Sequence, residues 1–236
     1  MLHHNKVCTL ALAFRKHEGW PVVVAANRDE ALDRPSVGPH LWKQGFVAPR
    51  DERAGGTWLG LTRGGLFLGV TNRFPTLRDA ARGSRGTLVA ELLESPDART
   101  LHERASKVDP LRYNAFHLMY ADEKDAFITW SDGEKLTAYA LEPGLHVVTE
   151  RSFGGDDAER VGALRSAWPV EPAPEALQRT LRLPQTYMFV PEYNYGTRSS
   201  MVLLQGPSGR RFYWAEGQPP TPPAFSERAD LIAALG

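Results

Sequence analysis

The chain has 236 residues, 42% of them hydrophobic, and its 28 lysines and arginines balance its 28 aspartates and glutamates. The zero net charge gives no field for steering onto nucleic acid or an anionic membrane, and the apolar content is that of a folded protein. One cysteine excludes an internal disulfide, and no apolar run approaches the ~20 residues of a membrane span. We therefore expect a cytoplasmic, soluble protein of one domain over residues 1–236, with no nucleic-acid partner. The sequence predicts no particular oligomeric state.

Strands are predicted to dominate the first third of the chain. Short apolar or β-branched runs predict strands at 8–14, 21–26, 57–62 and 66–71. The last two runs flank Arg63-Gly64-Gly65 and are typical of a β-hairpin, with Asn72 at the end of its second strand. The stretch 32–53 is rich in proline and glycine, so it is predicted to be mostly loop.

Helices and strands then alternate in blocks. Helices are predicted after the caps Ser84, Asp97 and Asp156 or Asp157, over 175–183, and from Ser226. Strands are predicted at 116–120, 126–130, 135–141, 199–205 and 211–215. This order lacks strict β-α-β alternation, so it favours a layered α+β fold over a parallel doubly wound sheet.

Cys8 is the most informative residue, because it is single and opens the first predicted strand. Most free cysteines are small buried hydrophobes. A cysteine at the start of a chain can instead be a nucleophile whose own α-amino group is the base. That chemistry needs a free amine, and seven residues precede Cys8. We expect the mature chain to begin at Cys8, since a GTG codon at Val7 would be read as methionine when it initiates.

Three polar residues follow predicted strands and suit the same chemistry. Arg28 would stabilise a thiolate and Asp29 would orient an amine, although the two side chains could simply form a surface ion pair. Asn72 could aim its amide at an oxyanion or only shape a turn. The segment 193–200 could be a plain loop or place Arg198 and hydroxyls at a pocket mouth. The seven histidines show no ligand spacing, so no metal site is predicted.

Taken together, these motifs resemble the NRDE family, also called the transport and Golgi organisation 2 family. The resemblance covers nearly the whole chain. Its motifs are Cys8-Thr9-Leu10, Ala25-Ala26-Asn27-Arg28-Asp29-Glu30 with Arg34-Pro35, Gly55-Gly56-Thr57-Trp58-Leu59-Gly60, Val70-Thr71-Asn72 and Tyr195-Gly196-Thr197-Arg198-Ser199-Ser200.

The family is similar to the N-terminal-nucleophile hydrolases, which implies a four-layer αββα sandwich of two antiparallel sheets. In the related cysteine amidases an N-terminal cysteine is the nucleophile, an arginine and an aspartate support it, and an asparagine binds the oxyanion. The resemblance therefore assigns these roles to Cys8, Arg28, Asp29 and Asn72. A second pocket asparagine of the family is missing here, and Glu150 lies near its place.

Two hypotheses follow from the sequence. The first is a cofactor-independent cysteine amidohydrolase for a small-molecule amide, with Cys8, Arg28, Asp29 and Asn72 catalytic. The second is a non-catalytic binding or trafficking protein for a lipid, an acyl-CoA or haem, in which Arg28 clamps an anion. In either case the substrate or ligand would be bound by Asn27, Glu30, Arg198 and Ser199.

Overall fold

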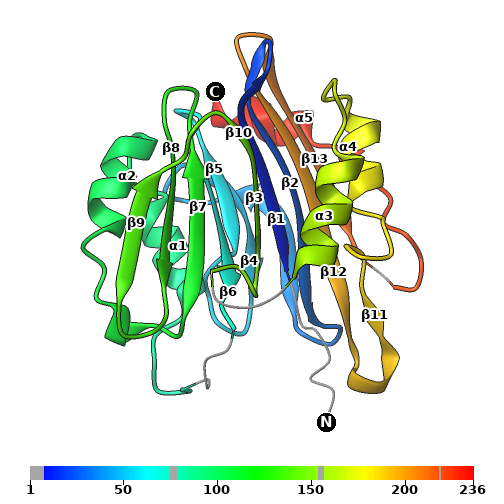
Figure 1. The fold of residues 1–236 in the computed structure, drawn as a ribbon. Coiled ribbons are helices and arrows are strands. Elements are labelled where there is room, and N and C mark those ends of the chain that lie inside the picture. Colours follow the sequence, from blue (N-terminus) through cyan, green and yellow to red (C-terminus); the bar gives the residue numbers. More distant parts are fainter. Residues whose placement is uncertain (1–7, 75–78, 154–156, 218) are drawn as a thin grey trace.

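The computed structural model describes residues 8–74, 79–153, 157–217 and 219–236. In these residues two seven-stranded sheets lie face to face, and helices cover the outer face of each (Figure 1). Every strand pair within the two sheets is antiparallel. The predicted α+β class and four-layer αββα sandwich are therefore confirmed.

The first sheet has the order β10-β1-β2-β12-β13-β14, with β11 paired to β12. Its centre is formed by β1, β2 and β12, so strands from the early and the late parts of the chain pair in one sheet. Its strands are β1 (Thr9–His17), β2 (Trp20–Ala31), β10 (Gly144–Thr149), β11 (Phe189–Val190), β12 (Tyr195–Gly206), β13 (Gly209–Glu216) and β14 (Ser226–Glu227).

The second sheet is a meander in which β3 to β9 follow one another in chain order. The predicted hairpin is its β5–β6 pair, and Asn72 ends β6 as expected. Its strands are β3 (Ser36–Leu41), β4 (Phe46–Asp51), β5 (Leu59–Thr62), β6 (Phe67–Asn72), β7 (Phe116–Ala121), β8 (Ala126–Ser131) and β9 (Leu136–Ala140).

Three apolar clusters hold the four layers together. One fills the space between the sheets, for example with Leu12, Val24 and Phe67. A second packs α1 and α2 onto the second sheet, and a third packs α3 and α4 onto the first. The helices are α1 (Arg85–Leu92), α2 (Ala98–Ala105), α3 (Ala158–Ala167), α4 (Pro174–Thr180) and α5 (Ala229–Leu235), with 3-10 turns η1 (Pro110–Arg112) and η2 (Pro191–Tyr193).

Helix starts were predicted well where a side chain caps the backbone. Ser84 accepts a hydrogen bond from Gly86 N, and Asp97 accepts one from Thr100 N. Helix α3 begins at Ala158 without a side-chain cap from Asp157, and the alternative cap Asp156 lies outside the described residues. No helix in the described part of the chain is long and apolar enough to cross a bilayer.

The prediction of a loop over 32–53 is wrong, because strands β3 and β4 lie there. Strand β3 is at the sheet edge, and its register shifts between Val37 and His40, so Pro39 sits in an irregularity. Pro49 lies in the part of β4 beyond its pairing with β5. Proline is tolerated at both places because no ladder hydrogen bond is needed from it.

Candidate functional site

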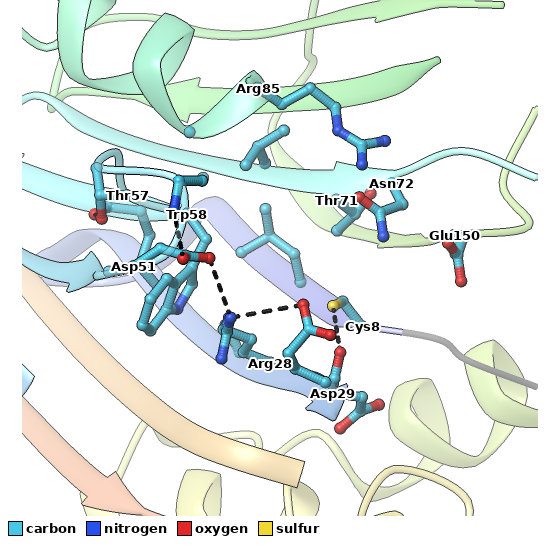
Figure 2. A pocket seen from close by; sticks show the side chains of 18 of the residues that line it. Cys8, Arg28, Asp29, Asp51, Thr57, Trp58, Thr71, Asn72, Arg85 and Glu150 are labelled. Atoms are coloured by element: carbon cyan, nitrogen blue, oxygen red, sulfur yellow. Dashed lines mark hydrogen bonds and ion pairs between the residues drawn. The ribbon is translucent and has the colours of Figure 1, made fainter. Parts of the chain in front are cut away.

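A cavity of about 460 Å³ lies between the two sheets at the end of the sandwich where β1 begins. It is lined by the ends of β1, β2, β6 and β12, by the segment before β5 and by the start of α1. Cys8, Arg28, Asp29 and Asn72 all contribute to its lining (Figure 2). The structure thus brings together the four residues for which the sequence predicts catalytic roles. We call it the Cys8 cavity.

Strand register aligns four lining residues across the first sheet. Thr9 pairs with Asn27 on one side and with Thr149 on the other. One residue earlier, Cys8 therefore lies level with Arg28 and with Glu150, and Arg28 in turn pairs with Ser199. All four line the cavity. We call Glu150, Cys8, Arg28 and Ser199, in this spatial order, the Cys8 row.

The Cys8 thiol is held in a form that is not reactive by itself. Its Sγ donates to the backbone oxygen of Asp29 at 3.6 Å. Burial raises the pKa of the thiol to about 12, and the charges of Asp29 and Glu150 add to the rise. The charge of Arg28 lowers this pKa, but its effect is the smallest of those that act on the thiol. While residues precede Cys8, burial therefore outweighs the stabilisation of the thiolate that was expected from Arg28.

The reason lies in the contacts of Arg28. Its guanidinium stacks on the Trp58 ring at 4.2 Å, and its Nη2 lies 3.5 Å from carboxylate oxygens of both Glu30 and Asp51 (Figure 2). A neighbouring cation, Arg34, makes the closer contact with Asp51, at 2.7 Å. The charge of Arg28 is thus directed toward the carboxylates rather than the thiol.

Asp29 lies on the opposite face of the first sheet from Arg28, because adjacent residues of a strand alternate. Its Oδ1 accepts from Thr197 Oγ1 at 2.7 Å, and its Oδ2 lies 3.8 Å from Nη1 of Arg160 on α3. Oδ2 has no hydrogen-bond partner within the described residues. Burial raises the pKa of Asp29 to about 7, against the lowering effects of Thr197 and Arg160.

Asn72 and Glu150 lie on the other side of Cys8, toward the second sheet. Figure 2 shows the Asn72 amide facing the cavity above Cys8, with Glu150 beside the strand ends. The backbone joins their segments, since Phe74 N donates to Glu150 O at 2.7 Å. Glu150 lines the cavity and brings a negative charge close to Cys8.

The four residues predicted to bind the substrate are divided by the strand geometry. Glu30 and Ser199 line the cavity. Asn27 also borders it, but its amide donates to the Leu181 and Thr186 carbonyls, at 2.9 and 2.7 Å, and so anchors the segment after α4. Arg198 is not among the cavity-lining residues of the described chain.

A bulge explains the position of Arg198. The β2–β12 register shifts between Thr197 and Ser199, so Arg198 is the extra residue. Its Nη1 contacts the Gly217 carbonyl at 3.4 Å instead. The bulge also changes the alternation of β12, so that Thr197 meets Asp29 on the helical side while Ser199 faces the cavity beside Arg28.

Several functional neighbours were not singled out from the sequence. The ring of Trp58 lies in a family motif, which was a usable signal, whereas Asp51 fell in the supposed loop. Arg85 begins α1 and reaches into the cavity from above (Figure 2). Arg160 meets Asp29 from α3, more than a hundred residues away, and local pattern carries no sign of that contact. Within the described residues, no group of three or more His, Cys, Asp or Glu side chains is placed to hold a metal ion.

The fold resembles that of solved structures whose names are those of hydrolases. An N-acylethanolamine-hydrolyzing acid amidase ortholog of Caenorhabditis elegans superposes with a TM-score of 0.60 over 84% of this chain and 92% of its own, at 14% identity. A conjugated bile acid hydrolase variant of Clostridium perfringens gives 0.51 over 94% and 93%, at 11% identity. At these identities the likeness establishes a shared fold and no more.

Curated relatives share more sequence. A Transport and Golgi organization protein 2 homolog of Bos taurus is 34% identical over 135 residues, 53% of this chain and 49% of its own. The Mus musculus homolog is 28% identical over 144 residues, 58% and 50% of the two chains. The chain thus spans about half the length of these relatives. The family model described as Transport and Golgi organisation 2 matches residues 7–169, and the chain belongs to that family.

Proposed function

We propose that the chain is a cysteine amidohydrolase that acts on a small-molecule amide when Cys8 carries a free α-amino group. One observation supports this above all others. Cys8, Asp29 and Asn72 all line one cavity, and Oδ2 of the buried Asp29 carboxylate has no hydrogen-bond partner within the described residues. The fold shared with two amide hydrolases supports the same reaction class.

Asp29 fits the task of orienting the amine. In the β1–β2 register the backbone nitrogen of Cys8 falls between the levels of Arg28 and Asp29. A protonated α-amine there would supply the missing partner of Asp29 Oδ2 and would lower the raised pKa of this carboxyl. The cation would also lower the pKa of the Cys8 thiol, which is about 12 while the nitrogen is an amide. Exposure of the amine therefore converts an inert thiol into a nucleophile.

The reaction then proceeds in two displacements. The neutral α-amine takes the thiol proton, which forms the ammonium–thiolate pair, as Sγ attacks the amide carbon, and Asn72 donates to the oxygen that gains negative charge. The C–N bond breaks, and the leaving amine takes the proton from the α-ammonium. Water then attacks the Cys8 thioester with the α-amine as base, which releases the carboxylic acid and restores the thiol.

A carrier of a lipid, an acyl-CoA or haem is the second candidate. It is favoured by the thiol itself, because a Cys8 pKa of about 12 means no thiolate at neutral pH while residues precede Cys8. The names of the curated relatives also refer to transport. In that case the cavity binds its ligand without chemistry.

The test is a protein that begins at Cys8, obtained by cleavage of a leader that leaves no residue behind. It is incubated with phenoxyacetyl amides, bile conjugates and acyl-homoserine lactones, and the released amine or acid is measured. The proposal expects turnover of at least one amide, which Cys8→Ala abolishes. Ligand binding without any turnover would favour the carrier.

A further inference from the structure

Two buried polar groups beside Cys8 lack hydrogen-bond partners within the described residues. They are Nη1 of Arg28 and Oγ of Ser199. Arg28 is 7% exposed and Ser199 is 3% exposed, yet both line the Cys8 cavity. A buried polar group without a partner is costly, and in most proteins such groups are paired. Two of them on one cavity wall indicate the position of a ligand atom.

The two residues that carry these groups are neighbours in the first sheet. Arg28 and Ser199 are directly opposite each other in the β2–β12 ladder, and adjacent strands are about 4.8 Å apart. Two indole rings complete this wall, because Trp58 stacks on Arg28 and lies 6.1 Å from Trp214, and both rings line the cavity. This wall therefore has two polar side chains bordered by aromatic rings. We call Arg28, Ser199, Trp58 and Trp214 together the Arg28 notch.

The donors in the notch select the ligand chemistry. A guanidinium only donates and a serine hydroxyl can donate, so the ligand atom is an acceptor. The charge of Arg28 is only loosely matched, since its carboxylate contacts with Glu30 and Asp51 are both 3.5 Å long. Asp51 is engaged more closely by Arg34 and by the backbone amides of residues 53 and 54. An anionic oxygen pair therefore completes the notch better than a neutral carbonyl, because charge-assisted hydrogen bonds to arginine are the stronger ones.

The Cys8 row sets the position of this anion relative to the reacting bond. Arg28 lies next to Cys8, and Ser199 lies one strand further on. A group held between them is therefore roughly one to two strand spacings, about 5–10 Å, from the thiol. Glu150 lies on the opposite side of Cys8, so a negative ligand group is repelled on that side and attracted on the Arg28 side. A carboxylate within a few covalent bonds of the scissile carbonyl meets both conditions.

We infer that Arg28 and Ser199 bind a carboxylate of the substrate, so that the substrate is an amide with an acid group close to the scissile bond. The acid can belong to the amine half, as in an N-acyl amino acid, or to the acyl half, as in the monoamide of a short dicarboxylic acid. This inference rests on the proposed function only where it calls the ligand a substrate. The carboxylate site itself does not require catalysis. It also gives Arg28 a role in recognition rather than in activating Cys8.

The test measures binding in a protein that cannot react. Calorimetry on the full chain with Cys8→Ala compares N-octanoylglycine and N-octylsuccinamic acid with their neutral carboxamides, N-octanoylglycinamide and N-octylsuccinamide. We expect one of the acids to bind about tenfold or more tightly than its neutral partner. The acid that shows the preference identifies the half of the substrate that carries the carboxylate.

Added substitutions locate the site. Arg28→Gln should remove the preference for the acid, and Ser199→Ala should reduce it while the protein keeps its fold. Arg198→Gln is the matched control, because Arg198 neighbours Ser199 in sequence but lies outside the cavity lining, so its preference should equal that of the parent. Equal binding of acid and carboxamide, a preference unchanged in both Arg28→Gln and Ser199→Ala, or no binding of any probe at millimolar concentration would each overturn the inference.

The two proposals fail in different ways. If the chain that begins at Cys8 hydrolyses amides without preference for an acid, the carboxylate site falls and the amidohydrolase stands. If the Cys8→Ala protein prefers the acid while no amide is turned over by the protein with Cys8 exposed, the hydrolase falls and the carboxylate site stands.

Discussion

His117 offers the sharpest test of how the cavity is held together. This fully buried residue of β7 links Thr71, a cavity residue of β6, to the turn that carries Glu150. Its Nδ1 lies 3.0 Å from Thr71 Oγ1, and its Nε2 lies 3.0 Å from the Ser152 carbonyl. A neutral ring can accept from the hydroxyl and donate to the carbonyl. A protonated ring donates from both nitrogens, so the Thr71 hydroxyl must turn and accept, and a charge is buried at this position.

Burial lowers the pKa of His117 from 6.5 to about 4. His117 is thus protonated near pH 6.5 in the unfolded chain but only near pH 4 in the folded chain. The stability contributed by the neutral ring is complete above pH 6.5 and is lost as the pH falls toward 4. Integration between pH 7 and pH 4.5 gives a loss of about 2.5 kcal/mol.

Urea unfolding at pH 7 and pH 4.5 measures this loss. The wild type should lose about 2.5 kcal/mol more than His117→Gln over that interval, because glutamine keeps a donor for Ser152 but does not titrate. His146→Gln, at a half-buried histidine on β10, is the control and should behave as the wild type. If wild type and His117→Gln lose the same stability on acidification, His117 does not hold the cavity as a neutral ring.

Four further predictions concern the site and the helices around it. With residues attached before Cys8, iodoacetamide should react slowly at pH 8, because burial raises the pKa of the thiol to about 12; a chain that begins at Cys8 should react faster, and equal rates would contradict the role of the amine. Asn72→Ala should lower kcat about 10²–10³-fold with KM little changed, whereas a fall in step with the folded fraction would make Asn72 a turn residue. Gly56→Ala should cost about 1–3 kcal/mol and shift α1 with Arg85, because its Cβ would collide with the backbone of Gly86. Gly162→Ala meets open space in α3 and should gain up to about 1 kcal/mol in urea unfolding.

Local sequence signals predicted the α+β class and most of the strands, whereas the αββα sandwich and the roles of the four site residues came from the family resemblance. Apolar strands placed Cys8, Arg28 and Asp29, and the tight hairpin placed Asn72, because strand ends and turns depend on neighbouring residues. Alternation along β2 would also have separated Arg28 from Asp29, since adjacent residues face opposite sides of a sheet. The proline-rich β3 and β4 were missed because edge position and pairing partners, which tolerate proline, are properties of the assembled sheet.

The remaining features depend on long-range pairing and burial. Glu150 reaches Cys8 only because β10 pairs with β1, and Arg160 reaches Asp29 only because α3 packs across the first sheet. One extra residue in β12 removes Arg198 from the cavity and turns Ser199 into it, and no local pattern marks that bulge. The raised pKa of Cys8 is decided by burial, which a single charge motif does not reveal.

The central claim is that an exposed Cys8 amine turns this thiol into an acyl-accepting nucleophile. Intact mass spectrometry of the chain that begins at Cys8, quenched with acid during incubation with an amide that it cleaves, tests this most directly. We predict an increase by the mass of the acyl group, located on Cys8, absent from Cys8→Ala and from the chain that keeps residues before Cys8. If no amide in the screen gives an adduct or releases its amine from the chain that begins at Cys8, the nucleophile account is contradicted.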